Sequence, residues 1–197
     1  RKKISQADLL SEAFADASAI RLVFLNGVYA PELSSRDRLP EGVGLQSLAE
    51  SIKGDDEFLS TQLGRYASYR QQSLVALNTA FIGDGAVLVV PPGRRLAEPV
   101  QLIYVSGADG GQLVTHPRTL IFLGAGSEAK IIESYIGMTR ESYFCNAVTE
   151  LIAERDSLAE HCRVQREGEA AFHTGTFEAK LARGAHLMAH AVTLAGS

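Results

Sequence analysis

The chain has 197 residues, of which 46% are hydrophobic and 21% charged, and its formal net charge is −4. This charge argues against a generic nucleic-acid or anionic-membrane binder, and the near-average composition excludes a disordered or collagen-like chain. Two cysteines do not make a disulfide scaffold, so we expect one globular domain, with or without an appendage, in a reducing, cytoplasmic compartment.

The region 1–80 is predicted to be rich in helix and to contain one hairpin. Ser5 and Asp8 resemble a capping box, which marks the start of a helix. Apolar residues follow at helical spacing: Leu9, Leu10, Ala13, Phe14 and Ala17. The aliphatic run at 20–25 then meets Asn26-Gly27, the strongest two-residue turn signal, which predicts a hairpin over 20–30.

A loop and three short helices complete this region. Proline and glycine at 34–44 predict the loop. Ser47-Leu48-Ala49-Glu50 is typical of a helix start, because the serine hydroxyl can accept from a free backbone N–H. The helices are expected at about 45–53, 56–64 and 70–80.

From residue 81 to residue 197 the hydrophobic period changes to two, which indicates short strands. No apolar run reaches the length of about 18 residues that a transmembrane helix needs. The candidate strands are Val87–Val90, Val100–Ser106, Thr119–Leu123, Ala129–Ile136, Tyr143–Ala153, Ala159–Gln165, Thr174–Ala182 and His186–Leu194.

A corner motif recurs between these strands at intervals of about 29 residues. It reads Gly126-Ser127, Asp156-Ser157 and Gly184-Ala185, and Gly85-Ala86 is a more distant copy. Glycine or aspartate suits a corner that needs a positive φ. The recurrence in register favours a parallel β-helix, with one rung per repeat, over an antiparallel sandwich.

The repeat also predicts which side chains face the interior of this β-helix. Two alternating sets follow each corner, and we expect the more apolar set to line the core: Ile132, Ser134, Ile136, Cys162, Val164, Met188, His190, Val192 and Leu194. The other set is expected to face outward: Ile131, Glu133, Tyr135, His161, Arg163, Ala189, Ala191 and Thr193.

Several short blocks resemble one known family. The blocks are Leu77-Asn78-Thr79-Ala80-Phe81, Asp84-Gly85-Ala86, Val90-Pro91-Pro92-Gly93, Pro99-Val100, His116-Pro117-Arg118-Thr119-Leu120, Gly124-Ala125-Gly126-Ser127 and Glu133. In this order they are similar to the SufB/SufD family, the scaffold proteins of the SUF iron–sulfur cluster assembly machinery. The run Arg21 to Tyr29 resembles the hairpin of the SufD branch in particular.

The resemblance implies a small helical N-terminal region followed by a right-handed parallel β-helix. It also implies a non-catalytic role, in which the protein pairs with a SufB-like scaffold and, through a C-terminal helical domain, with the SufC ATPase. The nascent iron–sulfur cluster and a reduced flavin are implied only for the complete complex. We therefore expect no catalytic or metal-binding residue here, and we name no cofactor-binding residue.

The chain starts at Arg1 without a methionine and stops at Ser197 within the strand pattern. On the family resemblance, later rungs and the C-terminal helical domain would follow. We therefore expect this stretch not to bind SufC by itself. An open last rung would leave an unpaired strand edge, which favours self-association.

Four histidine and cysteine positions are candidates for a metal site. His186 and His190 share one face of a strand but lie about 13 Å apart along it, which is too far for one ion. Cys162 and His190 occupy the same position after their corners, so they should be neighbours in adjacent rungs. Two ligands make a poor site, and a free cysteine usually behaves as a small hydrophobe. Cys145 has no partner at a metal-binding spacing, and we expect no disulfide.

An alternative function is a carbohydrate-active enzyme, a lyase or hydrolase, built on a parallel β-helix. Such enzymes use paired carboxylates, and four acidic residues lie close in the sequence: Glu150, Glu154, Asp156 and Glu160. We interpret them as a solvated face and corner. Gly83-Asp84-Gly85 and Gly124-Ala125-Gly126 lack the phosphate-loop pattern, and Arg94-Arg95 is too small for a nucleic-acid patch.

Overall fold

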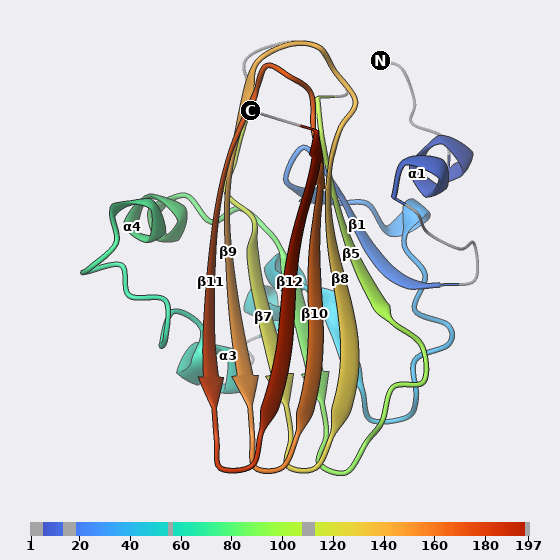
Figure 1. Ribbon diagram of the computed structural model, residues 1–197, viewed down its shortest axis with the longest axis vertical. Helices are drawn as coiled ribbons and strands as arrows, with labels where there is room; N and C mark the ends of the chain where they lie inside the picture. The colour runs from blue at the N-terminus through green and yellow to red at the C-terminus, as the bar shows by residue number, and fades with distance from the viewer. Residues whose placement is uncertain (1–5, 14–18, 55–56, 108–112, 196–197) are drawn as a thin grey trace.

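The structure, a computed structural model, describes residues 6–13, 19–54, 57–107 and 113–195. It is a flattened β-solenoid, in which the chain passes alternately between two sheets that face each other (Figure 1). Sheet A has the strand order β12-β10-β8-β5-β1-β2, and sheet B has the order β11-β9-β7-β4-β3 with β6 beside β9. Most neighbouring pairs are parallel, and only β1–β2 and β3–β4 are antiparallel among the named strands.

The strands differ mainly in length, and the later rungs are the longest. Sheet A contains β1 (Ile20–Leu25), β2 (Val28–Tyr29), β5 (Val100–Ser106), β8 (Glu128–Gly137), β10 (Leu158–Arg166) and β12 (His186–Ala195). Sheet B contains β3 (Gly44–Ser47), β4 (Ala86–Val90), β6 (Leu113–Thr115), β7 (Arg118–Leu123), β9 (Tyr143–Ala153) and β11 (Ala171–Leu181).

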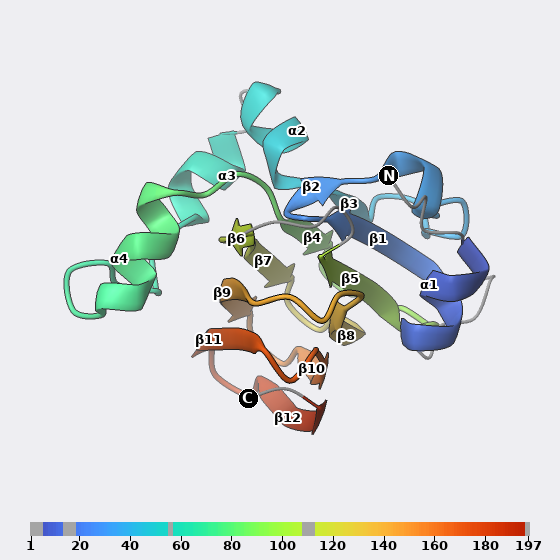
Figure 2. The same ribbon diagram turned by 90° about the horizontal axis from the view of Figure 1, so that it is seen from above.

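Helices cover part of the outer faces of both sheets, where they reach β8 of sheet A and β9 of sheet B (Figure 2). The helix α1 (Gln6–Ala13) lies beside sheet A, where Leu9 and Ala13 pack with Val23, Ile103 and Ile136. The other helices lie on the side of sheet B: α2 (Leu48–Lys53), α3 (Glu57–Gln62) and α4 (Ser73–Ala80). A short 3-10 helix, η1 (Pro31–Leu33), follows the β1–β2 hairpin.

The structure confirms the solenoid and each candidate strand of residues 81–197 to within a few residues at the ends. It also confirms the hairpin, whose turn residues Asn26 and Gly27 have φ angles of 49° and 79°. The helix start at Ser47 is confirmed, because its side chain accepts a hydrogen bond from the Glu50 N–H. The expected helix over 45–53 begins later than predicted, since 44–47 form β3, and β6 was not predicted.

The corners of successive rungs stack at one end of the strands. Gly93, Gly126, Asp156 and Gly184 all have positive φ angles, between 58° and 73°. Each of the first three donates its backbone N–H to a carbonyl of the next corner: Ala125, Arg155 and Arg183. Gly93 is therefore the fourth copy of the motif, and the prediction that placed it at Gly85 is wrong. Gly85 precedes β4 instead, where a Cβ would lie 1.9 Å from the Arg118 carbonyl oxygen.

This stacking predicts different costs for two glycine-to-alanine substitutions. Gly126→Ala is expected to lower the free energy of unfolding by about 1 kcal/mol, since its φ of +67° disfavours any Cβ although the space around it is open. Gly83→Ala is the matched control, because its Cβ also meets nothing within 4 Å but its φ is ordinary. Urea unfolding of both variants checks this, and equal losses would contradict the conformational explanation.

The prediction of the inward-facing set is wrong. Ile131, Glu133, Tyr135 and His161 point between the sheets and are at most 3% exposed. The more apolar set, including Met188, Val192 and Leu194, lies on the outer face of sheet A, where these three are 41–55% exposed. Apolar character failed as a guide for two reasons. The interior carries polar side chains that satisfy one another, and α1 buries part of the outer face at Ile136.

Candidate functional site

A belt of polar side chains crosses the interior between the two sheets. Tyr104, Thr119, Glu133, Thr149 and His161 come from β5, β7, β8, β9 and β10, and parallel register places them in consecutive rungs. We call these five residues the interior belt. On the corner side of the belt, the core is apolar, with Leu102, Ile121, Leu123, Ile131 and Leu151 fully buried.

Glu133 is the centre of the interior belt. Its Oε2 lies 3.1 Å from His161 Nε2, and both of its oxygens lie 3.0 Å from the Thr149 hydroxyl. An ionised carboxylate only accepts, so Nε2 of His161 carries the proton and donates. Burial alone would raise the pKa of Glu133, but hydrogen bonds from His161, Thr119 and Thr149 and the His161 charge hold it below its ordinary value.

An aromatic ladder runs beside the belt. Phe24, Tyr104 and Tyr135 are cross-strand neighbours, and their rings stack with centroids 4.9 and 5.0 Å apart. The Tyr104 hydroxyl is 2.8 Å from Thr119 Oγ1, which joins the ladder to the belt. Burial raises the pKa of both tyrosines well above the ordinary value, so their hydroxyls stay protonated.

A second polar cluster lies near the opposite ends of these strands from the corners. Glu167 Oε2 is 2.8 Å from His173 Nδ1, and its Oε1 accepts a 3.0 Å hydrogen bond from the Tyr143 hydroxyl. Burial would raise the pKa of Glu167, but the bond and charge of His173 and the bonds of Gln165 and Tyr143 lower it. Buried titratable groups are therefore paired in both clusters.

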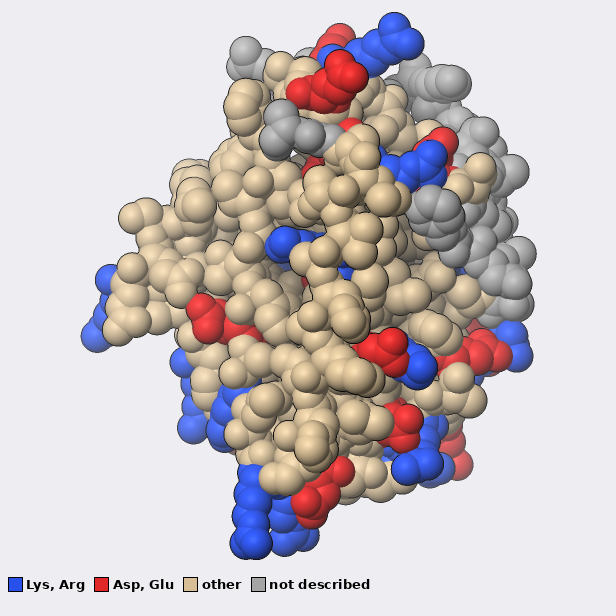
Figure 3. All heavy atoms as spheres, in the orientation of Figure 1, with Lys and Arg blue, Asp and Glu red and all other residues tan. Residues whose placement is uncertain are grey.

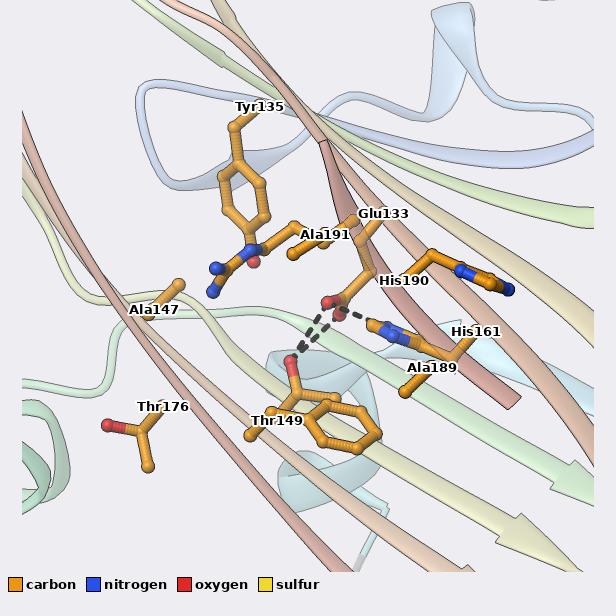
Figure 4. A pocket seen from close by; sticks show the side chains of 12 residues that line it. Glu133, Tyr135, Ala147, Thr149, His161, Thr176, Ala189, His190 and Ala191 are labelled. Carbon is orange, nitrogen blue, oxygen red and sulfur yellow. Dashed lines mark hydrogen bonds and ion pairs between the residues drawn. The ribbon is translucent and has the colours of Figure 1, made fainter. Parts of the chain in front are cut away.

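A cavity of about 200 Å³ opens between the sheets next to the interior belt (Figure 4). Its walls come from both sheets, with Glu133, Tyr135, Thr149 and His161 pointing toward it. The remaining lining residues are Ala147, Arg163, Gly175, Thr176, Phe177, Ala189, His190 and Ala191. The ring of His161 lies 4.6 Å from that of Phe177, so this part of the wall is closed by an aromatic contact.

A buried ion pair attaches the helical segment, which we define as residues 57–80 with α3 and α4, to the outer face of sheet B. Arg118 and Glu150 have fully buried side chains, and Arg118 Nη2 lies 2.6 Å from Glu150 Oε1. Glu150 also accepts backbone N–H bonds from Gly64, Tyr66 and Ala67, which lie between α3 and α4. This carboxylate therefore neutralises a strand arginine and holds a loop at the same time.

Two further buried polar side chains, Asn78 and Asp84, also join separate segments of the chain through hydrogen bonds. Asn78 on α4 donates to the carbonyls of Pro117 and Asn146 and accepts from Arg118. Asp84 accepts from the backbone N–H groups of Tyr29, Ala49 and Gly85 and from the Ser47 hydroxyl. Asp84 thereby links the hairpin, the start of α2 and the start of β4.

The structure places Cys162 and His190 on the outer face of sheet A and Cys145 in the interior. Cys162 and His190 are register neighbours as predicted, and both lie on the outer face of sheet A, where His190 is exposed. Cys145 faces the interior, and burial raises the pKa of its thiol to about 12. Both cysteines are free, and no group of three His, Cys, Asp or Glu side chains suited to a metal occurs among the described residues.

The acidic cluster predicted from the sequence is not one solvated face. Glu150 is fully buried beneath the helical segment, so its assignment to a solvated surface is wrong. Glu160 lies on the outer face of sheet A, 2.9 Å from Lys130 Nζ, and Asp156 occupies an exposed corner. Glu150 and Glu160 therefore do not converge, because β9 and β10 belong to different sheets and each carboxylate lies on the outer face of its own sheet.

The surface seen in Figure 3 is mostly uncharged over β11 and β12. Charged side chains gather at both ends of the strands, at the upper and lower edges of that view, and along the sides. Arg94 and Arg95 are exposed, and Arg95 forms an ion pair of 3.1 Å with Glu128. Within the described part of the chain, no helix has both the length and the apolar character that crossing a bilayer requires.

Sequence reasoning missed the roles of Arg118, Glu133, Glu150 and His161. A signal was present for some of them, since Asn78, Arg118 and Glu133 lie in the blocks that carry the family resemblance. A charged or amide side chain inside a predicted strand is costly to bury unless it is paired. Such a residue therefore indicates a buried polar network when a partner of opposite charge or matching hydrogen-bonding capacity can be assigned to a neighbouring strand.

Two family models match almost the whole chain in sequence order. Residues 10–102 match the model described as the SufBD protein N-terminal region. Residues 104–197 match the model described as the SUF system FeS cluster assembly, SufBD core domain. The boundary between the two matches falls within β5.

Individual relatives give the same result. The chain is 30% identical over 169 residues to an iron–sulfur cluster assembly SufBD family protein of Synechocystis, covering 82% of this chain and 37% of the relative. It is 24% identical over 181 residues to the iron–sulfur cluster assembly protein SufD of Escherichia coli, covering 91% and 40%. It is 30% identical over 96 residues to the chloroplastic protein ABCI7 of Arabidopsis thaliana, covering 46% and 20%. The chain thus spans two fifths or less of the length of these relatives.

Proposed function

The chain belongs to the SufB/SufD family, and from that premise we propose that it is part of a non-catalytic scaffold subunit for iron–sulfur cluster assembly. The proposal rests on the two consecutive family matches, which together run from residue 10 to residue 197. The partners in this proposal are a SufB-like scaffold and the SufC ATPase. The SufD branch is favoured by the similarity to the Escherichia coli protein along 91% of the chain.

The chemistry of the described residues supports a scaffold role. The buried carboxylates of Glu133, Glu150 and Glu167 are each engaged by a cationic or imidazole side chain, which stabilises the fold and leaves them occupied. The two thiols are separated by a sheet, since Cys145 faces the interior and Cys162 the outside. These residues do not supply a set of ligands for a cluster, so in this proposal the cluster and the reduced flavin belong to the complete complex.

The alternative of a carbohydrate-active enzyme has less support. It requires two carboxylates that face a common substrate from one side of neighbouring rungs. Glu150 is buried on the outer face of sheet B, whereas Glu160 lies on the outer face of sheet A. These two carboxylates therefore lie on opposite outer faces of the solenoid.

We further propose a cytoplasmic location for the protein, on the basis of its two free thiols, which fit a reducing compartment. The name of the Arabidopsis relative places that protein in the chloroplast. Fractionation of the source cells, followed by detection of the full-length protein, distinguishes the two locations.

We expect the full-length protein to co-purify from its source cell with a SufB-like protein and an ATPase of the SufC type in defined stoichiometry. Iron and acid-labile sulfide should be measured in the purified complex. Co-purification should be lost when the SufB-like partner is deleted, which serves as the control. A full-length protein that purifies alone and cleaves acidic polysaccharides would overturn the scaffold proposal in favour of the enzyme.

A further inference from the structure

Arg163 is a charged residue on the interior face of sheet A that forms no hydrogen bond with the interior belt or with the Glu167 cluster in the described part of the chain. It lies on β10 directly beside Glu133 of β8 in the parallel register. The Glu133 carboxylate is nevertheless occupied by His161 and Thr149. No hydrogen bond or ion pair connects Arg163 to another residue in the described ranges, and its Nε is buried without an acceptor.

The chain leaves room for this guanidinium on the opposite sheet. A Cβ on Gly175 of β11 would lie 2.0 Å from Arg163 Nη1, so any side chain at this position would displace the guanidinium. Gly175 has no positive φ that would require glycine for the backbone. Glycine at position 175 therefore leaves the space that the guanidinium of Arg163 occupies.

The same guanidinium lines the cavity of about 200 Å³ described above. Tyr135 lines it as well, and burial keeps its hydroxyl protonated and able to donate a hydrogen bond. The remaining wall near Arg163 includes Ala147, Ala189 and Ala191, which are small and leave the space open. A half-buried cation without an acceptor, in a cavity with a second donor, is suited to a negatively charged ligand.

We propose that this cavity binds a small oxyanion, such as phosphate or a carboxylate, on the guanidinium of Arg163 with the Tyr135 hydroxyl as a second donor. The planar guanidinium offers two parallel N–H groups, which match two oxygens of such an anion. A volume of about 200 Å³ accommodates a ligand of this size. This site is independent of the scaffold proposal, because it rests only on the geometry around Arg163.

The experiment measures the thermal unfolding midpoint of the full-length protein against inorganic phosphate and, separately, acetate. Chloride keeps the ionic strength constant, so that general screening does not contribute. A ligand that binds only the folded state raises the midpoint in a saturable way. We expect such a rise with at least one of the two anions for the wild-type protein.

Three variants assign the effect to Arg163. Arg163→Met should weaken the apparent affinity at least tenfold, and in chloride its midpoint should equal or exceed that of the wild type, since an unpartnered charge has been removed. Gly175→Ala should also weaken binding while keeping the charge. Arg155→Met, which removes an exposed corner arginine, should bind as the wild type does. No saturable rise in the wild type, or an unchanged rise in Arg163→Met, would overturn the proposal.

Discussion

Replacing Glu150 with alanine is expected to lower the free energy of unfolding by about 3–5 kcal/mol, because it leaves the buried charge of Arg118 without its partner. Both side chains are fully buried, so water cannot replace the lost carboxylate without opening the structure. The substitution also removes the acceptor for the N–H groups of Gly64, Tyr66 and Ala67. The segment between α3 and α4 should therefore lose its attachment to sheet B.

Urea unfolding gives the overall loss, and amide hydrogen exchange of residues 57–80 shows whether the loss begins at this segment. Glu154→Ala removes a partly exposed carboxylate just beyond β9 and should change stability by less than about 0.5 kcal/mol. The double variant Arg118→Met with Glu150→Gln removes both charges and should recover part of the loss. A loss in Glu150→Ala no larger than in Glu154→Ala would show that the ion pair does not hold the segment.

The strands of residues 81–197 could be predicted from the sequence because their pattern depends on local properties. Alternation, β-branched residues and corners at Gly126, Asp156 and Gly184 are all visible in one chain. Cys162 and His190 were correctly placed as neighbours, since the repeat fixes the parallel register. β3 was missed because its four residues gain their structure from antiparallel pairing with β4, whose residues lie 39 (Ser47 to Ala86) to 45 (Gly44 to Val89) positions later in the chain.

The inward-facing set could not be predicted by comparing hydrophobicity. Glu133 and His161 are tolerated inside because each satisfies the other, and that depends on contacts between rungs. Ile136 appears on the apolar outer face because α1, from the other end of the chain, covers it. In both cases the deciding partner is distant in sequence, so the local pattern favoured the wrong face.

The blocks that carry the family resemblance coincide with buried polar contacts. Asn78, Asp84, Arg118 and Glu133 each join at least two segments of the chain through hydrogen bonds. Gly85 permits the close approach of the Arg118 backbone. A chain that folds in this way requires these residue types at these positions, which is a physical reason for the blocks to be recognisable.

Replacing Glu133 with glutamine is expected to lower the free energy of unfolding at neutral pH by about 2–4 kcal/mol, because the buried His161 loses its anionic partner. The shape of the side chain is preserved, so the loss reports on charge and hydrogen bonding and not on a new cavity. Thr149, which donates to both carboxylate oxygens, keeps one acceptor in the variant. Glu169→Gln is the control, because Glu169 is an exposed carboxylate in the connection between β10 and β11. Its substitution should leave the free energy of unfolding unchanged.

The same substitution should flatten the acid limb of the stability curve. The pKa of Glu133 is lowered in the folded state by the hydrogen bond and charge of His161, against the effect of burial. Its contribution is therefore present above the unfolded-state pKa of about 4.3 and is lost as the pH falls through the lower folded-state pKa. Glu167 has the same direction of shift, so Glu133→Gln should remove part of the slope and the double variant with Glu167→Gln more of it.

Urea unfolding at a series of pH values from about 3 to 7 measures this slope directly. If the wild type and Glu133→Gln lost stability in parallel on acidification, the pKa of Glu133 would be the same in the folded and the unfolded states, which would contradict the lowered folded-state pKa. A steeper loss in the wild type instead requires an ionised Glu133 between the sheets, which in turn requires the proton of His161 to remain on Nε2.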